Sequence, residues 1–283
     1  MNWQLSWQRW PEYRLLMRLE KPIGIYLLLW PTWWALWLAA RGVPDIGLLL
    51  VFSVGVILMR SAGCVINDYA DRNFDGQVER TAMRPLAKGS VSATEALQLF
   101  TLLVGLSACL LFWLNWQTML LSLVAVILAA IYPFMKRYTH FPQVVLGAAF
   151  SWGMPMAFMA IQLQLPALVW YLYLANLCWT VAYDTYYAMV DKPDDLKAGI
   201  KSTAILFGKH VLVTILLLQL LTLLLLGYVG VLAQLSMVYY AALVCCSLAR
   251  QSRAGCFQAF LDNHYVGLLV FSGIALHYYI TGS

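Results

Sequence analysis

The sequence predicts an all-α, polytopic membrane protein whose nine transmembrane helices form a single domain over residues 1–283. Composition is the first reason, because 62% of the residues are hydrophobic and only 11% are charged. A soluble domain carries about 25% charged residues. The second reason is that three long stretches, 96–135, 138–183 and 211–249, contain no Asp, Glu, Lys or Arg. Each is about twice as long as the roughly 20 residues that one span needs.

Residues 1–21 precede the first span and mix tryptophan with basic side chains. Trp3, Trp7 and Trp10 lie in this segment together with several Arg and Lys residues. Aromatic and basic residues in such a mixture are typical of a segment that lies in the membrane interface. The apolar run 23–40 that follows is long enough for a retained first span, which disfavours a cleaved signal peptide.

The remaining spans follow from apolar runs and from the breaks inside the charge-free stretches. The second span is expected over 46–66 and the last over 264–281. Each charge-free stretch has a polar or turn-forming break near its middle, which predicts two helices joined by a short turn. The breaks are Asn115-Trp116-Gln117, Gln162-Leu163-Gln164-Leu165-Pro166 and Gly227-Tyr228-Val229-Gly230.

The positions of the basic residues test this number of spans. With nine spans, every Lys and Arg except Arg41 falls on the same face of the membrane. The positive-inside rule makes that face cytoplasmic. The N-terminus and two acidic stretches, 67–89 and 184–201, are therefore predicted in the cytoplasm, with the C-terminus outside. The net charge of +5 then reflects orientation in the membrane and not binding to nucleic acid.

The first acidic stretch carries polar side chains at helical spacing. Asn67, Asp71 and Asp75 are each four residues apart, so on a helix they lie within an arc of about 80°. Ionisable residues beside a span are costly and are by default a functional hypothesis.

The second acidic stretch shows a similar spacing. Asp184, Asp191 and Asp195 also share one helix face. Pro193 leaves a continuous helix through this segment open, because proline removes a backbone hydrogen bond. We expect the two acidic faces to meet across one site at the membrane surface.

Clustered carboxylate and amide oxygens are hard ligands that suit Mg²⁺, which commonly shares its coordination shell with a phosphate. Two such faces could hold two magnesium ions with a diphosphate between them. Basic residues on the same face are available to complete the site. They are Lys21, Arg72, Arg84, Lys88, Lys136 and Arg137. The alternative is that the acids are solvated loop charges balanced by these bases.

These motifs resemble those of a known family. Asn67-Asp68-x-x-Asp71-x-x-x-Asp75, followed by Arg84-Pro85, resembles the first motif of the UbiA-type intramembrane prenyltransferases. The segment from Tyr183 to Ala204 resembles the branch of that family that prenylates 4-hydroxybenzoate in ubiquinone synthesis. Lys21-Pro22-Ile23-Gly24 and Tyr132-Pro133-Phe134-Met135-Lys136-Arg137 resemble the same branch. The resemblance runs along nearly the whole chain.

The resemblance implies a bundle of nine helices around a central cavity, similar to the soluble isoprenyl diphosphate synthases. It implies a Mg²⁺-dependent enzyme of the bacterial inner membrane that transfers a polyprenyl group from polyprenyl diphosphate to the carbon ortho to the hydroxyl of 4-hydroxybenzoate. No obligate protein partner is expected. The implied catalytic and metal-binding residues are Asp71, Asp75, Asp191 and Asp195, with Asn67 as a further metal ligand. The expected diphosphate-binding residues are the bases named above and Tyr132.

Some assignments stay open at this point. Arg60, near the end of the second span, is a candidate partner for the carboxylate of the aromatic acid, and a snorkelling arginine is the alternative. The residue that removes the ring proton is not identified. Rival functions are prenylation of a haem or naphthoate precursor, and secondary transport with acidic gates. A transporter would place its polar groups near the bilayer midplane, whereas these lie at span ends.

Overall fold

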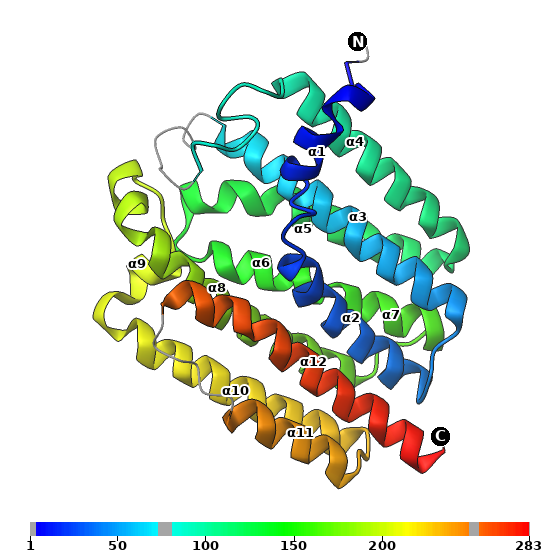
Figure 1. Ribbon diagram of the computed structural model, residues 1–283. Coiled ribbons are helices and arrows are strands. Elements are labelled where there is room, and N and C mark those ends of the chain that lie inside the picture. The colour runs from blue at the N-terminus through cyan, green and yellow to red at the C-terminus, as the bar shows by residue number, and fades with distance from the viewer. Residues whose placement is uncertain (1–3, 73–80, 249–254, 283) are drawn as a thin grey trace.

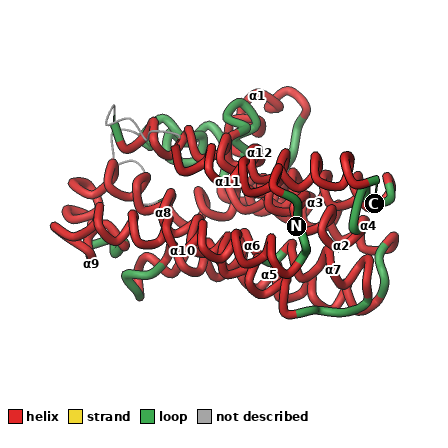
Figure 2. Tube along the Cα trace, turned by 90° about the horizontal axis from the view of Figure 1, so that it is seen from below, coloured by secondary structure: helices red, strands yellow, loops and turns green. Residues whose placement is uncertain are grey.

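The computed structural model describes residues 4–72, 81–248 and 255–282. Helices and short loops make up these residues, without a strand among them, which confirms the predicted all-α class (Figure 2). Within the described ranges, seven helical segments are long and apolar enough to cross a membrane. The other predicted spans correspond to α8 (Ala167–Ala198) and α11 (Met237–Leu248).

The helices follow the predicted order along the chain (Figure 1). The short helix α9 (Thr203–Phe207) lies between α8 and α10, and α6 and α7 meet at Trp152 to occupy one span. The remaining bounds are α2 (Ile23–Ala40), α3 (Ile46–Asp71), α4 (Ala93–Leu110), α5 (Trp116–Tyr138), α6 (Pro142–Ser151), α7 (Gly153–Gln162), α10 (Val211–Leu232) and α12 (Cys256–Thr281).

Contacts between helices close a ring. α2 packs on α3, α3 on α5, α5 on α6, α6 on α8, α8 on α12, and α12 back on α2. α4, α10 and α11 lie outside this ring, against α3, α8 and α12 respectively (Figure 1). Helices far apart in the sequence therefore surround one central space, as the predicted architecture requires.

Two of the three predicted breaks are turns. Asn115 caps α5 by accepting a hydrogen bond from the Thr118 amide at 2.9 Å, as a polar residue at a helix start commonly does. The second break also separates two helices, since α7 ends at Gln162 and Pro166 immediately precedes α8.

The predicted turn at Gly227–Gly230 is wrong, because α10 continues through it to Leu232. The glycine serves helix packing instead. A β-carbon on Gly230 would lie 2.7 Å from Cε1 of Tyr239 on α11, so only glycine permits this approach. The Tyr239 hydroxyl donates to the Leu226 carbonyl at 2.8 Å. The chain reverses after α10, between Leu232 and Met237.

Tryptophans in α2 pack the ring together. Trp34 is 1% exposed, stacks on Trp179 of α8 at a centroid distance of 5.6 Å, and donates from Nε1 to the Gly267 carbonyl of α12 at 2.9 Å. Buried aromatic side chains with a satisfied N–H contribute strongly to packing. This contact joins three helices of the ring, α2, α8 and α12. On α8 it lies before the acidic residues.

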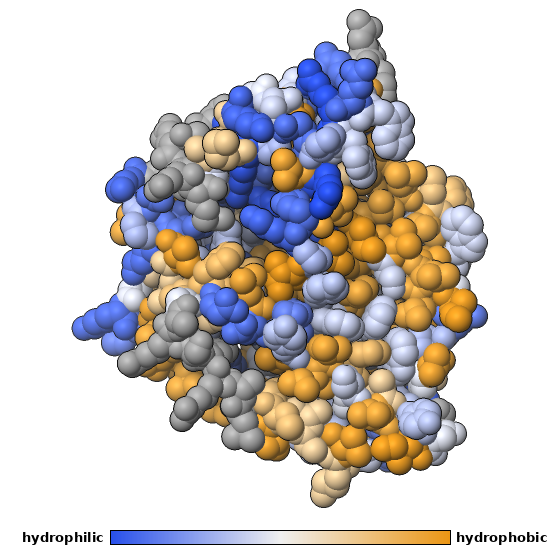
Figure 3. Space-filling model, in the orientation of Figure 1, coloured by the Kyte–Doolittle hydropathy of each residue, from blue (hydrophilic) through white to orange (hydrophobic). Residues whose placement is uncertain are grey.

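The N-terminal segment lies against the ring. The short helix α1 (Trp10–Leu16) buries Tyr13 and Leu16 in a cluster with residues of α3 and α4, while Trp7 is 82% exposed. Polar residues gather around α1 in the space-filling view, and apolar residues cover much of the rest of that face (Figure 3). The interfacial location of this segment stays a prediction.

Candidate active site

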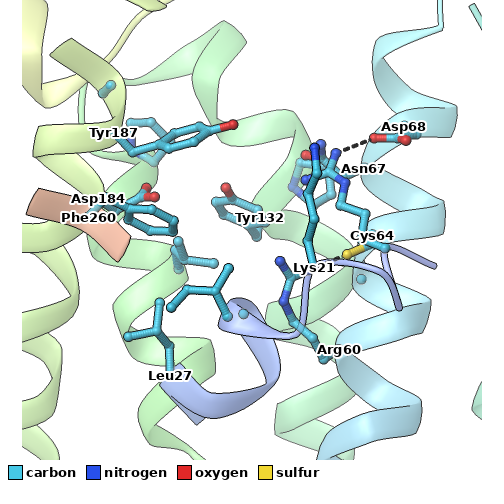
Figure 4. Close-up of a pocket in the computed structure, with 18 of the residues that line it drawn as sticks. Lys21, Leu27, Arg60, Cys64, Asn67, Asp68, Tyr132, Asp184, Tyr187 and Phe260 are labelled. Carbon is cyan, nitrogen blue, oxygen red and sulfur yellow. Dashed lines mark hydrogen bonds and ion pairs between the residues drawn. The ribbon is translucent and has the colours of Figure 1, made fainter. Parts of the chain in front are cut away.

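A cavity of about 1170 Å³ lies inside the ring, and all of the ring helices contribute to its wall. Apolar side chains such as Leu27, Leu146 and Phe150 line one part of it. Carboxylates and amides line the other part, where α3 and α8 end (Figure 4). We call this part the charged end; it is lined by Asn67, Asp68, Asp71, Asp191, Asp194 and Asp195.

Asp71 occupies the last turn of α3 and is 3% exposed. Its Oδ2 accepts a hydrogen bond from Lys136 Nζ of α5 and lies 3.5 Å from the Asn67 amide nitrogen one turn earlier. Its buried Oδ1 has no hydrogen-bond partner among the described residues. A buried carboxylate oxygen left without a partner is costly, so this atom favours a bound cation. Asp75, the third residue of the first motif, lies outside the described residues.

Asp68 is the most buried acid of the charged end, at 1% exposed. Its Oδ1 accepts from Arg18 Nη2 at 2.6 Å and from Arg84 Nη1 at 3.0 Å. Arg18 comes from the N-terminal segment and Arg84 from the connection between α3 and α4, and both line the cavity. Burial lowers the pKa of Arg18, but the Asp68 carboxylate and other nearby groups together raise that pKa above its ordinary value. Asp68 therefore joins two separate segments at the wall of the cavity.

The second motif lies on one uninterrupted helix. α8 continues through Pro193 to Ala198, which settles the question that the sequence left open. Asp184, Asp191 and Asp195 all line the cavity. Pro193 is exposed and cannot donate to the carbonyl four residues earlier, yet the helix continues past it to Ala198. The two acidic faces therefore meet across the same space.

Several of the predicted phosphate-binding side chains reach this space. The Tyr132 side chain lies in the cavity between α3 and α8 (Figure 4). Lys136 follows one turn later on α5 and contacts Asp71. The predicted residues that line the cavity in this group are Lys21, Arg84, Tyr132 and Lys136.

The other predicted bases lie elsewhere among the described residues. Arg72 donates to the Tyr69 carbonyl at 2.6 Å and stacks over the Tyr69 ring. Lys88 pairs with Glu12 at 3.4 Å. Arg137 donates to the Ala70 carbonyl at 2.6 Å. These three side chains do not belong to the cavity lining as described.

Arg60 lies deeper in the cavity, one turn before Cys64 on α3 (Figure 4). Its Nη1 donates to the Cys64 sulfur, and its buried Nε has no hydrogen-bond partner among the described residues. The ion pairs recorded for those residues do not include Arg60. The Asp184 carboxylate of α8 interacts with Arg60 electrostatically without a direct ion pair in the described residues, and such a cation in a membrane-embedded cavity favours an anionic ligand.

The structure adds cavity residues that the sequence did not single out. Arg18 and Tyr187 line the cavity, and Asp68 of the charged end forms an ion pair with Arg18. Asp184 was part of the predicted face but had no assigned role. Its spacing of seven residues from Asp191 was a usable signal. No sequence signal pointed to Arg18, because its partner Asp68 lies 50 residues away in the sequence.

The residue types at the charged end fit a magnesium-phosphate site. Within the described residues, no three His, Cys, Asp or Glu side chains are close enough to hold a metal by themselves. Mg²⁺ commonly keeps several waters and binds through one or two carboxylates together with substrate phosphates. The unpartnered Oδ1 of Asp71 and the facing carboxylates of α8 match that mode of binding.

Comparison with known proteins gives concordant results. The model of the UbiA prenyltransferase family matches residues 28–259. The 4-hydroxybenzoate octaprenyltransferase of Cronobacter sakazakii is 56% identical over 98% of this chain and 99% of its own length. The enzyme of the same name from Chromohalobacter salexigens is 57% identical over 95% of this chain and 93% of its own.

Solved structures of similar fold include a UbiA homolog from Aeropyrum pernix, with a TM-score of 0.79 and 24% identity over 89% of this chain and 97% of that one. A UbiA homolog from Archaeoglobus fulgidus, bound to GPP and Mg²⁺, has a TM-score of 0.72 and 19% identity over 96% of this chain and 100% of that one.

Proposed function

This chain belongs to the UbiA prenyltransferase family, and we propose that it transfers a polyprenyl group from polyprenyl diphosphate to 4-hydroxybenzoate. The product is 3-polyprenyl-4-hydroxybenzoate, an intermediate of ubiquinone biosynthesis, and diphosphate is released. The observation that carries this proposal is the cavity itself, in which two acidic helix ends and a lysine face one another beside an apolar chamber. Relatives of the same name, more than half identical over nearly the whole chain, support the choice of acceptor.

The charged end is the proposed diphosphate site. Bound Mg²⁺ would supply Lewis-acid neutralisation of the charge that develops on the departing diphosphate. Asn67 and Asp71 on α3, with Asp191 and Asp195 on α8, are the proposed ligands, and Asp75 belongs to the same motif. Lys21, Arg84 and Lys136 add fixed positive charge where negative charge grows, which stabilises the transition state.

The apolar chamber is proposed to protect the reactive carbon. When the bond from carbon to diphosphate oxygen breaks, an allylic cation is left that water would quench. Leu27, Leu146 and Phe150 line this part of the cavity and exclude water from it. The ring carbon ortho to the phenol then forms the new bond to the prenyl carbon, and the ring loses a proton to a base.

Arg60 is the proposed partner of the acceptor carboxylate. A guanidinium binds a carboxylate through paired N–H donors, and the direct ion pairs of the described residues do not include Arg60, whose charge interacts with Asp184 only at longer range. The distance along the helix supports this role, because Arg60 lies about two turns from Asn67 and so places the acceptor next to the diphosphate site without overlapping it.

The proposed location is the bacterial cytoplasmic membrane, with the charged end in the cytoplasm. The distribution of Lys and Arg supports this orientation. A water-soluble acid and a diphosphate headgroup would then enter from the cytoplasm, while the prenyl tail stays in an apolar environment.

The test is product formation in membranes that contain this protein. 4-Hydroxybenzoate and a prenyl diphosphate are supplied with Mg²⁺ or with EDTA, and Asp71→Asn is assayed in parallel. The expected result is Mg²⁺-dependent 3-prenyl-4-hydroxybenzoate that is absent with the variant. Prenylation of a different aromatic acceptor would change the substrate and keep the chemistry. Absence of any diphosphate chemistry in folded protein would overturn the proposal and favour transport.

A further inference from the structure

The first turn of α2 contacts Arg60 in an unusual way. A β-carbon on Gly24 would clash with Nε and Nη2 of Arg60 and would lie 2.8 Å from its Cζ. This distance is far below a van der Waals contact of about 3.5 Å. The guanidinium of Arg60 therefore occupies the space that any side chain at position 24 would need.

Within the described residues, the hydrogen bond of this guanidinium goes to a neutral group, and the Asp184 carboxylate interacts with it electrostatically. Its Nη1 donates to the Cys64 sulfur of the same helix, and its Nε is buried without a partner among the described residues. Gly24, Arg60 and Cys64 all line the cavity, and Arg60 extends from α3 into the cavity (Figure 4). Packing against Gly24 therefore limits where this cation can lie, because no direct ion pair fixes it within the described residues.

We propose that Gly24 is a positioning residue that sets the specificity of the cavity for an acceptor bearing a carboxylate. This inference rests on the proposed function. Because glycine has no side chain, the Arg60 guanidinium can lie directly against α2 at this position. Since a guanidinium binds a carboxylate only through correctly aligned N–H donors, a displaced guanidinium no longer meets the acceptor carboxylate.

The substitution Gly24→Ala is suited to this test because the clashing atoms are the end of a long, flexible side chain. The guanidinium moves more easily than a helix does, so the fold is expected to persist while the cation is displaced. Gly227→Ala on α10 is the matched control. A β-carbon at Gly227 meets nothing within 4 Å, and α10 does not line the cavity.

The experiment measures KM separately for each substrate in purified enzyme. Gly24→Ala is expected to raise the KM for 4-hydroxybenzoate about tenfold, the effect of losing one charge-assisted hydrogen bond. The KM for the prenyl diphosphate is expected to stay within about twofold, because the charged end is untouched. Gly227→Ala is expected to behave as wild type in both measurements.

A double-mutant cycle with Arg60→Lys identifies the route of the effect. Lysine lacks the planar guanidinium that fills the space beside Gly24. If Gly24 acts through Arg60, adding Gly24→Ala to Arg60→Lys changes the KM for 4-hydroxybenzoate less than twofold. The same tenfold rise in both backgrounds would overturn the proposal, as would an unchanged KM in Gly24→Ala alone.

Two further outcomes are also decisive. If Gly24→Ala does not fold, the double variant is expected to fold and to match Arg60→Lys, because the clash needs the guanidinium. Failure of the double variant to fold would contradict the proposal. Wild-type enzyme that does not prenylate 4-hydroxybenzoate would refute the proposed function instead, which keeps the two conclusions separate.

Discussion

The helix ends that carry the two acidic motifs differ in how they are joined to the rest of the molecule. Asp68 and Asp71 on α3 are 1% and 3% exposed, and their ion pairs reach the N-terminal segment, the connection after α3, and α5. On α8, the ion pair between Lys197 and Asp194 spans one turn of the same helix at 3.6 Å, with side chains 80% and 41% exposed. The α3 acids therefore join separate segments of the chain, whereas the ion pair of Asp194 stays within α8.

The largest expected effect separates activity from stability on α8. Asp191→Asn should reduce turnover by about a thousandfold or more, because it removes charge proposed to hold Mg²⁺ at the leaving group. Asparagine has nearly the same size as aspartate, so the midpoint of thermal unfolding should fall less than in Asp68→Asn, which weakens two ion pairs. Product formation and unfolding in detergent measure the two quantities. Asp262→Asn on α12, which lies outside the cavity lining, is the matched control.

A large loss of stability for Asp191→Asn would contradict the comparison and would mean that the end of α8 is also a structural junction. Normal turnover would remove Asp191 from the proposed metal site.

On α3 the corresponding experiment is Asp68→Asn, which should act first on stability. The substitution leaves Arg18 and Arg84 without their shared carboxylate, and breaking a buried ion pair on one side costs about 3 kcal/mol. Chemical unfolding at pH 7 measures this loss. An unchanged unfolding free energy, together with lost activity, would place Asp68 in the same class as the α8 acids.

The contrast between the two helix ends was only partly readable from the sequence. Spacing placed Asn67 and Asp71 on one face of a helix, and the structure places both in the cavity wall. The apolar and charge-free stretches predicted the order of the helices, while seven segments of the described residues, not nine, are long and apolar enough to span a membrane. Neither signal contains tertiary contacts, so the pairing of Arg18 with Asp68, 50 residues apart, could not be derived.

The helix break that the sequence misplaced has a clear physical origin. Glycine was taken as a sign of a turn at Gly227–Gly230, but Gly230 faces Tyr239 on a neighbouring helix. Glycine permits both a turn and a close approach, and only the neighbour distinguishes them. The contact of Gly24 with Arg60 is also a close approach, and it could not be predicted from the sequence either.

A smaller effect tests which base of α5 belongs to the charged end. Consecutive residues on a helix point about 100° apart, and the structure places Lys136 on Asp71 and Arg137 on the Ala70 carbonyl. Lys136→Ala should raise the KM for prenyl diphosphate about 10- to 100-fold. Arg137→Ala should raise this KM less, because Arg137 bonds to the Ala70 carbonyl at the end of α3 and would act only by holding that end in place. Steady-state kinetics with each substrate varied measures both.

An Arg137→Ala effect equal to or larger than that of Lys136→Ala would reverse this assignment. Arg137 would then be a diphosphate contact in the working enzyme, as its position in the sequence motif predicts.

The smallest effect lies on the N-terminal segment, which is attached to the α3 side of the molecule. Ser90 donates a 2.7 Å hydrogen bond to Glu12, and this bond, with the charge of Lys88, holds the pKa of Glu12 below its ordinary value. A carboxyl group with a lowered pKa adds stability above its unfolded pKa and loses it as the pH falls through the folded value. Glu12→Gln should therefore cost about 0.5 kcal/mol at pH 7.

That cost should shrink toward zero below about pH 4, where the carboxyl of the wild type is protonated as well. Unfolding free energies of the two proteins at several pH values measure the difference. A difference that grows on acidification would show that Glu12 is destabilised by its surroundings. The N-terminal segment would then be held by its apolar contacts through Tyr13 and Leu16 and by the Arg18 ion pair, without help from its surface charges.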